Sequence, residues 1–124
     1  MSRIETTYDL SRDLTIFKAV GTMEAAHFND YLQRFNEAGF TTQSMWDLSE
    51  AELSEITTDE IRSLALHGSQ LAATVTGGKT ALVFNSLFEY GLGRIFQTFV
   101  EMNMTPFEVE LFLSLDEAME WLGV

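Results

Sequence analysis

Residues 80–123 read TALVFNSLFEYGLGRIFQTFVEMNMTPFEVELFLSLDEAMEWLG, and this stretch decides the fold. It begins with a short apolar run at 80–85 and continues with helical periodicity at 86–103. A second strand-like segment follows at 107–112, and an amphipathic helical segment at 115–122 closes the stretch. Two strands separated by one helix need a parallel crossover, so the pattern predicts an α/β fold.

The two strands of this stretch differ in their polarity. Residues 81–84 are all apolar, which is typical of a central strand covered on both faces. Residues 107–112 alternate apolar side chains with Glu108 and Glu110, so this strand is expected nearer an edge. Ser114 and Glu117 have the spacing of a capping box, which predicts a helix start there.

Working back towards the N-terminus, residues 3–9 and 14–20 read as two strands joined by the turn residues 10–13, which predicts an antiparallel hairpin. Thr22 is placed to cap a helix that runs to Gly39, and residues 43–48 follow as a third strand. An acidic, irregular segment at 49–56 then leads to a second helix, whose capping box pairs Thr57 with Glu60.

Size and composition indicate one compact domain over residues 1–124. A chain of 124 residues is large enough to bury roughly two-thirds of its unfolded surface. The apolar fraction of 46% argues against disorder, and the absence of cysteine excludes disulfides and thiolate metal sites. No apolar run approaches the length of a membrane span, so we expect a soluble cytoplasmic protein with no membrane insertion.

The charge balance is strongly acidic. Nineteen acids against seven bases give a formal charge of −12, and no Lys or Arg follows Arg94. Binding to DNA or RNA depends on cationic groups that displace counterions, so we expect no nucleic acid partner. A solubilising acidic surface is favoured over a dedicated site for a basic partner.

Two glycine-containing motifs fail on their context. Gly78-Lys79-Thr80 resembles the end of a phosphate-binding loop, but position 73 is alanine and a helix precedes the motif where a strand is required. Gly91-Leu92-Gly93 begins like a dinucleotide fingerprint, but Phe96 replaces the third glycine and the motif lies inside a helix. We therefore interpret Gly91 and Gly93 as positions where the helix and the sheet approach closely.

No constellation of catalytic or metal-ligating residues is present. His27 and His67 are the only histidines, and they lack the spacing of a zinc site. The cluster of Glu50, Glu52 and Glu55 has no calcium-loop glycine and is interpreted as a solvated surface. The sequence predicts no catalytic residues, no metal and no cofactor, and therefore no enzyme.

Four segments resemble a known family: KTALV at 79–83, YGLGRIF at 90–96, PFEV at 106–109 and FLSLDEAMEWL at 112–122. With the order of elements, they resemble the SpoIIAA-like family, small bacterial relatives of the STAS (anti-sigma-factor antagonist) domain that are also compared with the CRAL-TRIO lipid-binding fold. The resemblance implies an α/β mixed sheet of about five strands, with an N-terminal antiparallel hairpin, then parallel crossovers, and helices on both faces.

The resemblance also implies a non-enzymatic regulatory module that binds a protein partner. STAS relatives are often switched by phosphorylation of a serine at the start of the helix after the third strand. Thr57 and Thr58 hold that place here and are the candidate phospho-acceptors or partner switch. Asp59 and Glu60 would repel a phosphate, and the usual preceding aspartate and following glycine are absent, so a capping role for Thr57 is favoured.

The alternative function is a carrier or sensor of a small apolar ligand or lipid, because ten phenylalanines exceed what a minimal core requires. Ligands of open α/β folds bind beyond the carboxyl ends of strands, and the candidate side chains there are Ser49, Asn85, Ser86 and Tyr90. The simpler interpretation is that phenylalanines 84, 88, 96 and 99 fill the core. The hairpin also leaves a sheet edge free, which would allow a homodimer.

Overall fold

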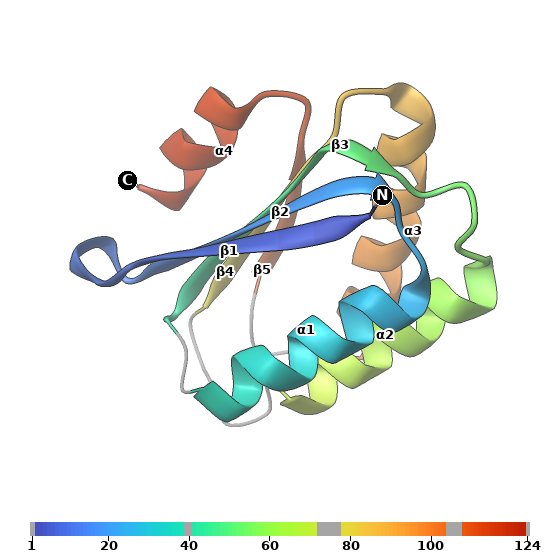
Figure 1. Ribbon diagram of the computed structural model, residues 1–124, viewed down its shortest axis with the longest axis horizontal. Coiled ribbons are helices and arrows are strands. Elements are labelled where there is room, and N and C mark those ends of the chain that lie inside the picture. Colours follow the sequence, from blue (N-terminus) through green and yellow to red (C-terminus); the bar gives the residue numbers. More distant parts are fainter. Residues whose placement is uncertain (1, 39–40, 72–77, 104–107, 124) are drawn as a thin grey trace.

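The computed structural model describes residues 2–38, 41–71, 78–103 and 108–123. Its elements run along the chain as a β-hairpin followed by alternating helices and strands (Figure 1). Their bounds are β1 Arg3–Asp9, the 3-10 turn η1 Leu10–Arg12, β2 Leu14–Thr22, α1 Ala25–Ala38, β3 Gln43–Glu52, α2 Thr58–Leu71, β4 Lys79–Val83, α3 Leu87–Met102, β5 Glu108–Phe112 and α4 Leu115–Leu122.

The five strands form one mixed sheet in the order β1-β2-β3-β4-β5. β1 and β2 pair antiparallel, and every later neighbour pairs parallel. The predicted hairpin, the parallel crossovers and the edge position of β5 are therefore confirmed. Crossovers between parallel strands are right-handed as a rule, so three crossovers that step in one direction across a sheet place their helices on one face. Accordingly, α1, α2 and α3 share one face, and α4 lies on the other (Figure 1).

The larger core lies between the sheet and helices α1 to α3. Phe17 of β2 and Trp46 of β3 are buried there and stack with ring centroids 4.2 Å apart. Phe28 of α1 meets the Trp46 ring edge-on at 5.6 Å. Large aromatic side chains at the middle of the sheet thus join the hairpin to the parallel strands and to the first helix.

A smaller core lies between the sheet and α4. It is formed by four strand residues and two helix residues, namely Leu14, Met45, Ala81, Val83, Ala118 and Leu122. The eight residues of α4 begin at the N-cap Ser114, whose hydroxyl accepts from the Glu117 amide, and end at Gly123 in the left-handed conformation. Trp121 of α4 is partly exposed and contacts Phe112 and the Lys79 ammonium.

Close approach of α3 and the sheet was predicted at Gly91 and at Gly93, and it occurs only at Gly93. A β-carbon at position 93 would lie 2.5 Å from Cζ of Phe84 and 3.3 Å from Cδ2 of Leu111. At Gly91 a β-carbon would meet nothing within 4 Å. The interpretation of Gly93 is confirmed, and the same interpretation of Gly91 is wrong because Gly91 points away from the sheet into solvent.

Two predicted boundaries are wrong for one shared reason. β2 continues through Thr22 and β3 continues through Glu52, so Thr22 is a strand residue and α1 begins only at Ala25. The two strands pass a register shift after Lys18 and then pair again, with Thr22 opposite Glu52. Main-chain pairing between distant segments therefore extends both strands beyond the point where local sequence signals would end them. Gly39 and Phe107 lie outside the described residues.

Candidate functional site

The parallel strands β3, β4 and β5 all end on the same side of the molecule, where helices α2, α3 and α4 begin (Figure 1). This arrangement collects the starts of three helices and the loops that precede them. Open α/β sheets bind their ligands and partners at such an end. The predicted site residues are therefore best judged by their position relative to this carboxyl end.

Thr57 and Thr58 lie at the carboxyl end, exposed, at the start of α2. The Glu60 amide donates to the Thr57 hydroxyl at 3.2 Å, and the Thr57 amide donates to the Glu60 carboxylate at 2.9 Å. These reciprocal bonds form the predicted capping box. The Thr57 hydroxyl thus has a structural partner, while Thr58 is the first residue of the helix itself.

Asn85 and Ser86 also lie at the carboxyl end, directly after β4. Asn85 is exposed, and Ser86 is the N-cap of α3, where its hydroxyl accepts from the Glu89 amide at 3.2 Å. Tyr90 packs against the main core, with its ring edge-on to Phe84 at 6.1 Å. Of these predicted ligand-facing residues, the structure leaves Asn85 open to solvent and gives Ser86 and Tyr90 structural contacts.

Ser49 was predicted to lie at a strand end, and this prediction is wrong because β3 runs on to Glu52. Its amide and hydroxyl both donate to one oxygen of the buried Asp47 carboxylate, at 3.1 and 2.6 Å. This local turn coincides with the register shift between β2 and β3. Ser49 therefore shapes a bulge within the sheet, and a ligand at the carboxyl end would meet other residues.

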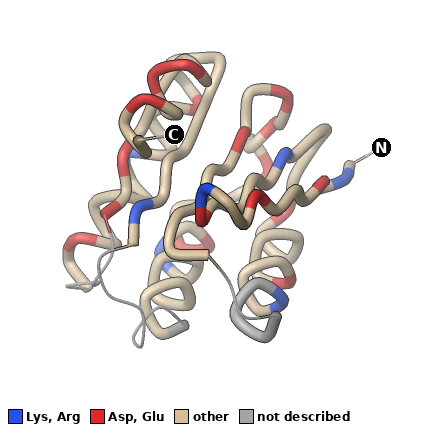
Figure 2. Tube along the Cα trace, turned by 90° about the vertical axis from the view of Figure 1, so that its left-hand side faces the viewer, with Lys and Arg blue, Asp and Glu red and all other residues tan. Residues whose placement is uncertain are grey.

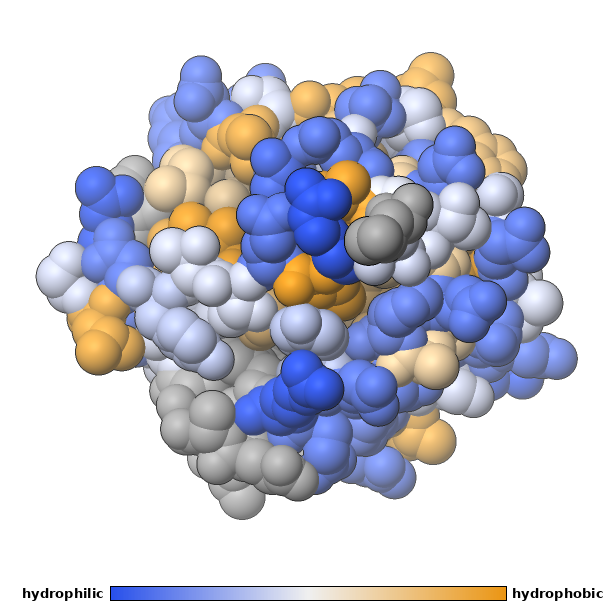
Figure 3. All heavy atoms as spheres, viewed as in Figure 1, coloured by the Kyte–Doolittle hydropathy of each residue, from blue (hydrophilic) through white to orange (hydrophobic). Residues whose placement is uncertain are grey.

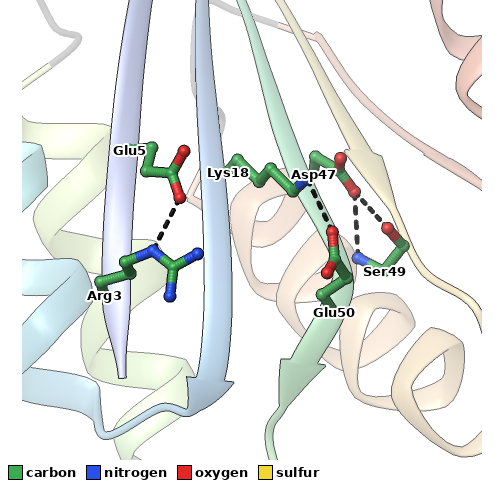
Figure 4. Close-up of polar contacts among 6 residues, drawn as sticks. All are labelled: Arg3, Glu5, Lys18, Asp47, Ser49 and Glu50. Carbon is green, nitrogen blue, oxygen red and sulfur yellow. Dashed lines mark hydrogen bonds and ion pairs between the residues drawn. The ribbon is translucent and has the colours of Figure 1, made fainter. Parts of the chain in front are cut away.

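Around that bulge, charged side chains line the part of the sheet formed by β1, β2 and β3 (Figure 4). Lys18 lies 2.7 Å from the Glu50 carboxylate, and the Arg3 guanidinium lies 2.7 Å from Glu5. The hydrogen bond that the Lys18 ammonium donates to the Glu50 carboxylate, together with the charge of Glu50, raises the pKa of Lys18 above its usual value. All four side chains are about half exposed, so these are surface ion pairs that contribute little to stability.

Glu89 joins the segment before α2 to the first turn of α3. Its carboxylate accepts from the Leu53 amide at 3.2 Å. Partial burial, opposed by that hydrogen bond and aided by the charge of Glu52, raises the pKa of Glu89 above its usual value. The bond is a direct contact between the loop before α2 and the first turn of α3.

The main feature that the sequence did not reveal is an apolar patch at this end, which we define as Leu87, Phe88, Leu113 and Leu115. Their exposed fractions are 78%, 62%, 51% and 43%. Leu87 and Phe88 begin α3 just after β4, and Leu113 and Leu115 follow β5. β4 and β5 pair along their length, and beyond β4 the Phe84 amide still donates to the Phe112 carbonyl. Figure 3 shows apolar surface at the upper right, over the start of α3.

Phe88 was expected in the core, and it is the one phenylalanine of the four that is not. Phe84 is buried, and Phe96 and Phe99 pack against the main core. Phe88 shares a flank of α3 with Leu92 and Phe99, which pack only partly against the main core. The residues of α3 that are buried, Gly93, Gln97 and Val100, lie on another side of the helix.

The patch has acidic surroundings. Asp116, Glu117 and Glu120 occupy α4, and Figure 2 shows this helix carrying acids without a base. Asp59 and Glu60 occupy the first turn of α2. In the sequence no Lys or Arg occurs between Arg34 and Arg62. The carboxyl end therefore combines exposed leucine and phenylalanine side chains with negative charge.

The histidine and acidic side chains are the groups in this chain that could meet the requirements of a metal site. Within the described ranges, no three histidine or acidic side chains are placed to hold a metal ion. His67 on α2 bonds to Asn29 on α1 at 2.8 Å, and His27 accepts from the Glu24 amide at 2.9 Å. Both histidines thus have structural roles. None of the described helices is long and apolar enough to cross a bilayer.

No family model matches the sequence, and no curated protein matches it. Solved structures do resemble the chain. An uncharacterised protein of the DUF3478 family with a SpoIIAA-like fold, from Shewanella loihica PV-4, is 21% identical with a TM-score of 0.60, over 98% of this chain and 95% of its own. An anti-sigma factor antagonist from Mycobacterium paratuberculosis is 14% identical with a TM-score of 0.62, over 100% and 94%.

The anti-sigma factor antagonist SpoIIAA in its unphosphorylated form is also similar, at 13% identity and a TM-score of 0.56, over 99% of this chain and 98% of that one. Likeness at these identities establishes the fold. The chain therefore has the SpoIIAA-like fold, as the sequence resemblance implied, with a five-stranded mixed sheet and helices on both faces.

Proposed function

We propose that this protein is a non-enzymatic regulatory module that binds a protein partner through the apolar patch at the carboxyl end of its sheet. The patch is the observation that carries the proposal. Four large apolar side chains are between 43% and 78% exposed at one end of a small domain. Large apolar side chains exposed at one end of a domain are unfavourable in water and commonly mark a site where a partner binds.

The charges around the patch define the partner's chemistry. Acids occupy the first turns of α2 and α4 at the same end of the sheet, and the whole chain carries a formal charge of −12. A complementary partner presents an apolar surface with Lys or Arg at its rim. Such charges speed association and exclude acidic competitors, while the apolar contact supplies most of the affinity.

The likeness to anti-sigma factor antagonists supports a regulatory role of this kind. Thr57 and Thr58 lie beside the same end of the sheet, and a phosphate on either would place further negative charge at the start of α2. We include a phosphorylation switch at Thr57 or Thr58 in the proposal. If the phosphomimetic variants Thr57→Glu and Thr58→Glu both bind the partner as the wild type does, the switch is absent.

The alternative of an apolar-ligand or lipid carrier has less support. It rested on the number of phenylalanines, but Phe84, Phe96 and Phe99 pack in or against the main core. They serve to fill the space between the sheet and α3. Native mass spectrometry of protein purified without detergent would show a bound lipid as added mass, which the carrier function requires and the binding module does not.

The proposal is tested by affinity capture from the native host with three baits: the wild type, the patch variant Leu87→Ser/Phe88→Ser, and the control Leu10→Ser/Met102→Ser. The control removes two side chains that are 80% and 70% exposed elsewhere on the surface. We expect a protein captured by the wild type and the control to be lost with the patch variant. A partner retained by the patch variant as well would refute the proposed binding surface.

A further inference from the structure

The free edge of β1 is long and has little protection against pairing with another strand. All seven residues of β1, Arg3–Asp9, pair with β2 in one uninterrupted register, so the strand has no bulge. Among the described strands, β2 is its only neighbour, and its other edge faces the viewer in Figure 1. Edge strands are usually protected by charged side chains, especially Lys, or by Pro, a bulge or short length. β1 carries Arg3, Glu5 and Asp9, but it has no Lys, Pro or bulge and is seven residues long.

The sequence of β1 is complementary to itself when it is reversed. We propose that two copies of this chain associate edge to edge through antiparallel β1 strands centred on Thr6. In that register all seven residues overlap, Arg3 lies opposite Asp9 of the partner subunit, and Ile4 lies opposite Tyr8 of the partner subunit. Directly opposed side chains in antiparallel strands are in contact, so each end gains an unlike-charge pair and an apolar pair.

Neighbouring registers lack this complementarity. Side chains alternate between the two faces of a sheet, so directly opposed residues stay on the same face only if the register shifts by two residues at a time. One step one way centres the pair on Glu5, which then opposes Glu5 of the partner subunit. One step the other way centres it on Thr7 and places Glu5 opposite Asp9 of the partner subunit. Only the register centred on Thr6 combines full overlap with unlike charges.

The contacts that β1 already makes are compatible with pairing. Arg3 bonds to Glu5 and Asp9 lies 3.3 Å from Arg12, and both are exposed ion pairs that exchange partners at little cost. The Tyr31 hydroxyl donates to the Ile4 carbonyl at 3.0 Å and ties the strand to α1. A carbonyl oxygen has two lone pairs, so this bond holds the edge in place without consuming its acceptor capacity.

The other edge of the sheet gives a contrast within the same molecule. β5 has only five residues and carries Glu108 and Glu110 on one face. Two antiparallel β5 strands centred on Glu110 would place this acid opposite Glu110 of the partner subunit. The geometry thus selects β1 as the edge that pairs.

Sedimentation equilibrium over a range of protein concentrations tests the association. We expect a species of about twice 14.0 kDa whose dissociation constant rises about tenfold with Arg3→Asp or with Asp9→Arg, since each substitution opposes like charges twice per dimer. The double variant Arg3→Asp/Asp9→Arg restores the unlike pairs and the dimer. The control Glu108→Arg on β5 leaves the dissociation constant unchanged.

The register is tested by disulfide formation, because the chain has no cysteine of its own. Opposed residues in antiparallel strands have Cα separations that suit a disulfide, so Thr6→Cys should cross-link two copies under mild oxidation at least tenfold faster than Thr7→Cys. Circular dichroism confirms that each variant is folded. A chain that stays monomeric up to about 1 mM, a dimer insensitive to both charge reversals, or faster cross-linking at position 7 would overturn the proposal.

Discussion

The contact between α3 and the sheet leads to a prediction with opposite signs at two neighbouring glycines. Replacing Gly93 with alanine puts a methyl group 2.5 Å from Cζ and 2.7 Å from Cε2 of Phe84, which is 1% exposed and has little room to move. Overpacking of this kind costs about 1–3 kcal/mol. Alanine regains about 0.5–1 kcal/mol through its better helix propensity. We therefore expect Gly93→Ala to lower the free energy of unfolding by about 1–2 kcal/mol.

Gly91→Ala is the matched control, since it makes the same chemical change in the same helix with nothing within 4 Å of the new methyl group. Only the propensity gain remains there, so this variant should be more stable by about 0.5–1 kcal/mol. For a domain of this size, we expect melting temperatures to fall by about 4–8 °C for Gly93→Ala and to rise by about 2–4 °C for Gly91→Ala.

Urea unfolding followed by circular dichroism measures both changes. Adding Phe84→Leu to Gly93→Ala provides a second check, because the smaller side chain makes room for the methyl group. The two substitutions should then be less destabilising together than the sum of their separate effects, by at least about 0.5 kcal/mol. Equal signs for the two alanine variants, or strict additivity in the double variant, would refute the close-approach reasoning.

Three further predictions concern polar groups. Gln97 is buried and donates to the Val109 carbonyl at 2.7 Å, so Gln97→Ala should cost about 1–3 kcal/mol in urea unfolding; a loss under about 0.3 kcal/mol would contradict this. Burial raises the pKa of Glu89, so the folded state retains that proton to higher pH than the unfolded chain, and the stability contributed by Glu89 falls as pH rises above 4.5. The melting temperature of Glu89→Gln relative to wild type should therefore increase from pH 4 to 7, and a constant difference would argue against the shift. Screening of the formal charge of −12 should raise the melting temperature between about 10 and 150 mM NaCl, and an unchanged value would count against self-repulsion.

Local signals in the sequence were sufficient for the helices and for most of the strands. Ser114 caps α4 as predicted, and Thr57 and Glu60 form their capping box. Ser86, where helical periodicity was predicted to begin, is the N-cap of α3. These motifs depend on residues within one turn of each other, so their spacing predicts the structure directly. The alternation in β5 likewise depended only on its own residues and gave its edge position correctly.

Features that depend on distant segments were predicted less well. The acidic stretch after Leu48 looked irregular, but pairing with β2 keeps it in β3 as far as Glu52. Phe88 shares a flank of α3 with Leu92 and Phe99 and was expected in the core, but it is exposed. Periodicity identifies the apolar side of a helix, but it cannot show how far the elements that cover that side extend along it. The apolar patch could therefore be located only in the folded structure.

The two proposed surfaces lie at different edges of one sheet, and this has a consequence for binding. β1 forms one edge, while the patch follows β4 and β5 at the other. A dimer joined through β1 would hold ten strands in one sheet and separate its two patches by about 35–45 Å across the strands, at about 4.8 Å per strand. Because the two copies run in opposite directions, the two carboxyl ends lie at opposite ends of the strands. A partner whose two binding sites can reach both ends would then gain affinity by avidity. Arg3→Asp should weaken binding to such a partner immobilised at high density by tenfold or more, while its affinity for a single site in solution stays at the wild-type value. Equal loss in both assays would mean that β1 contacts the partner directly.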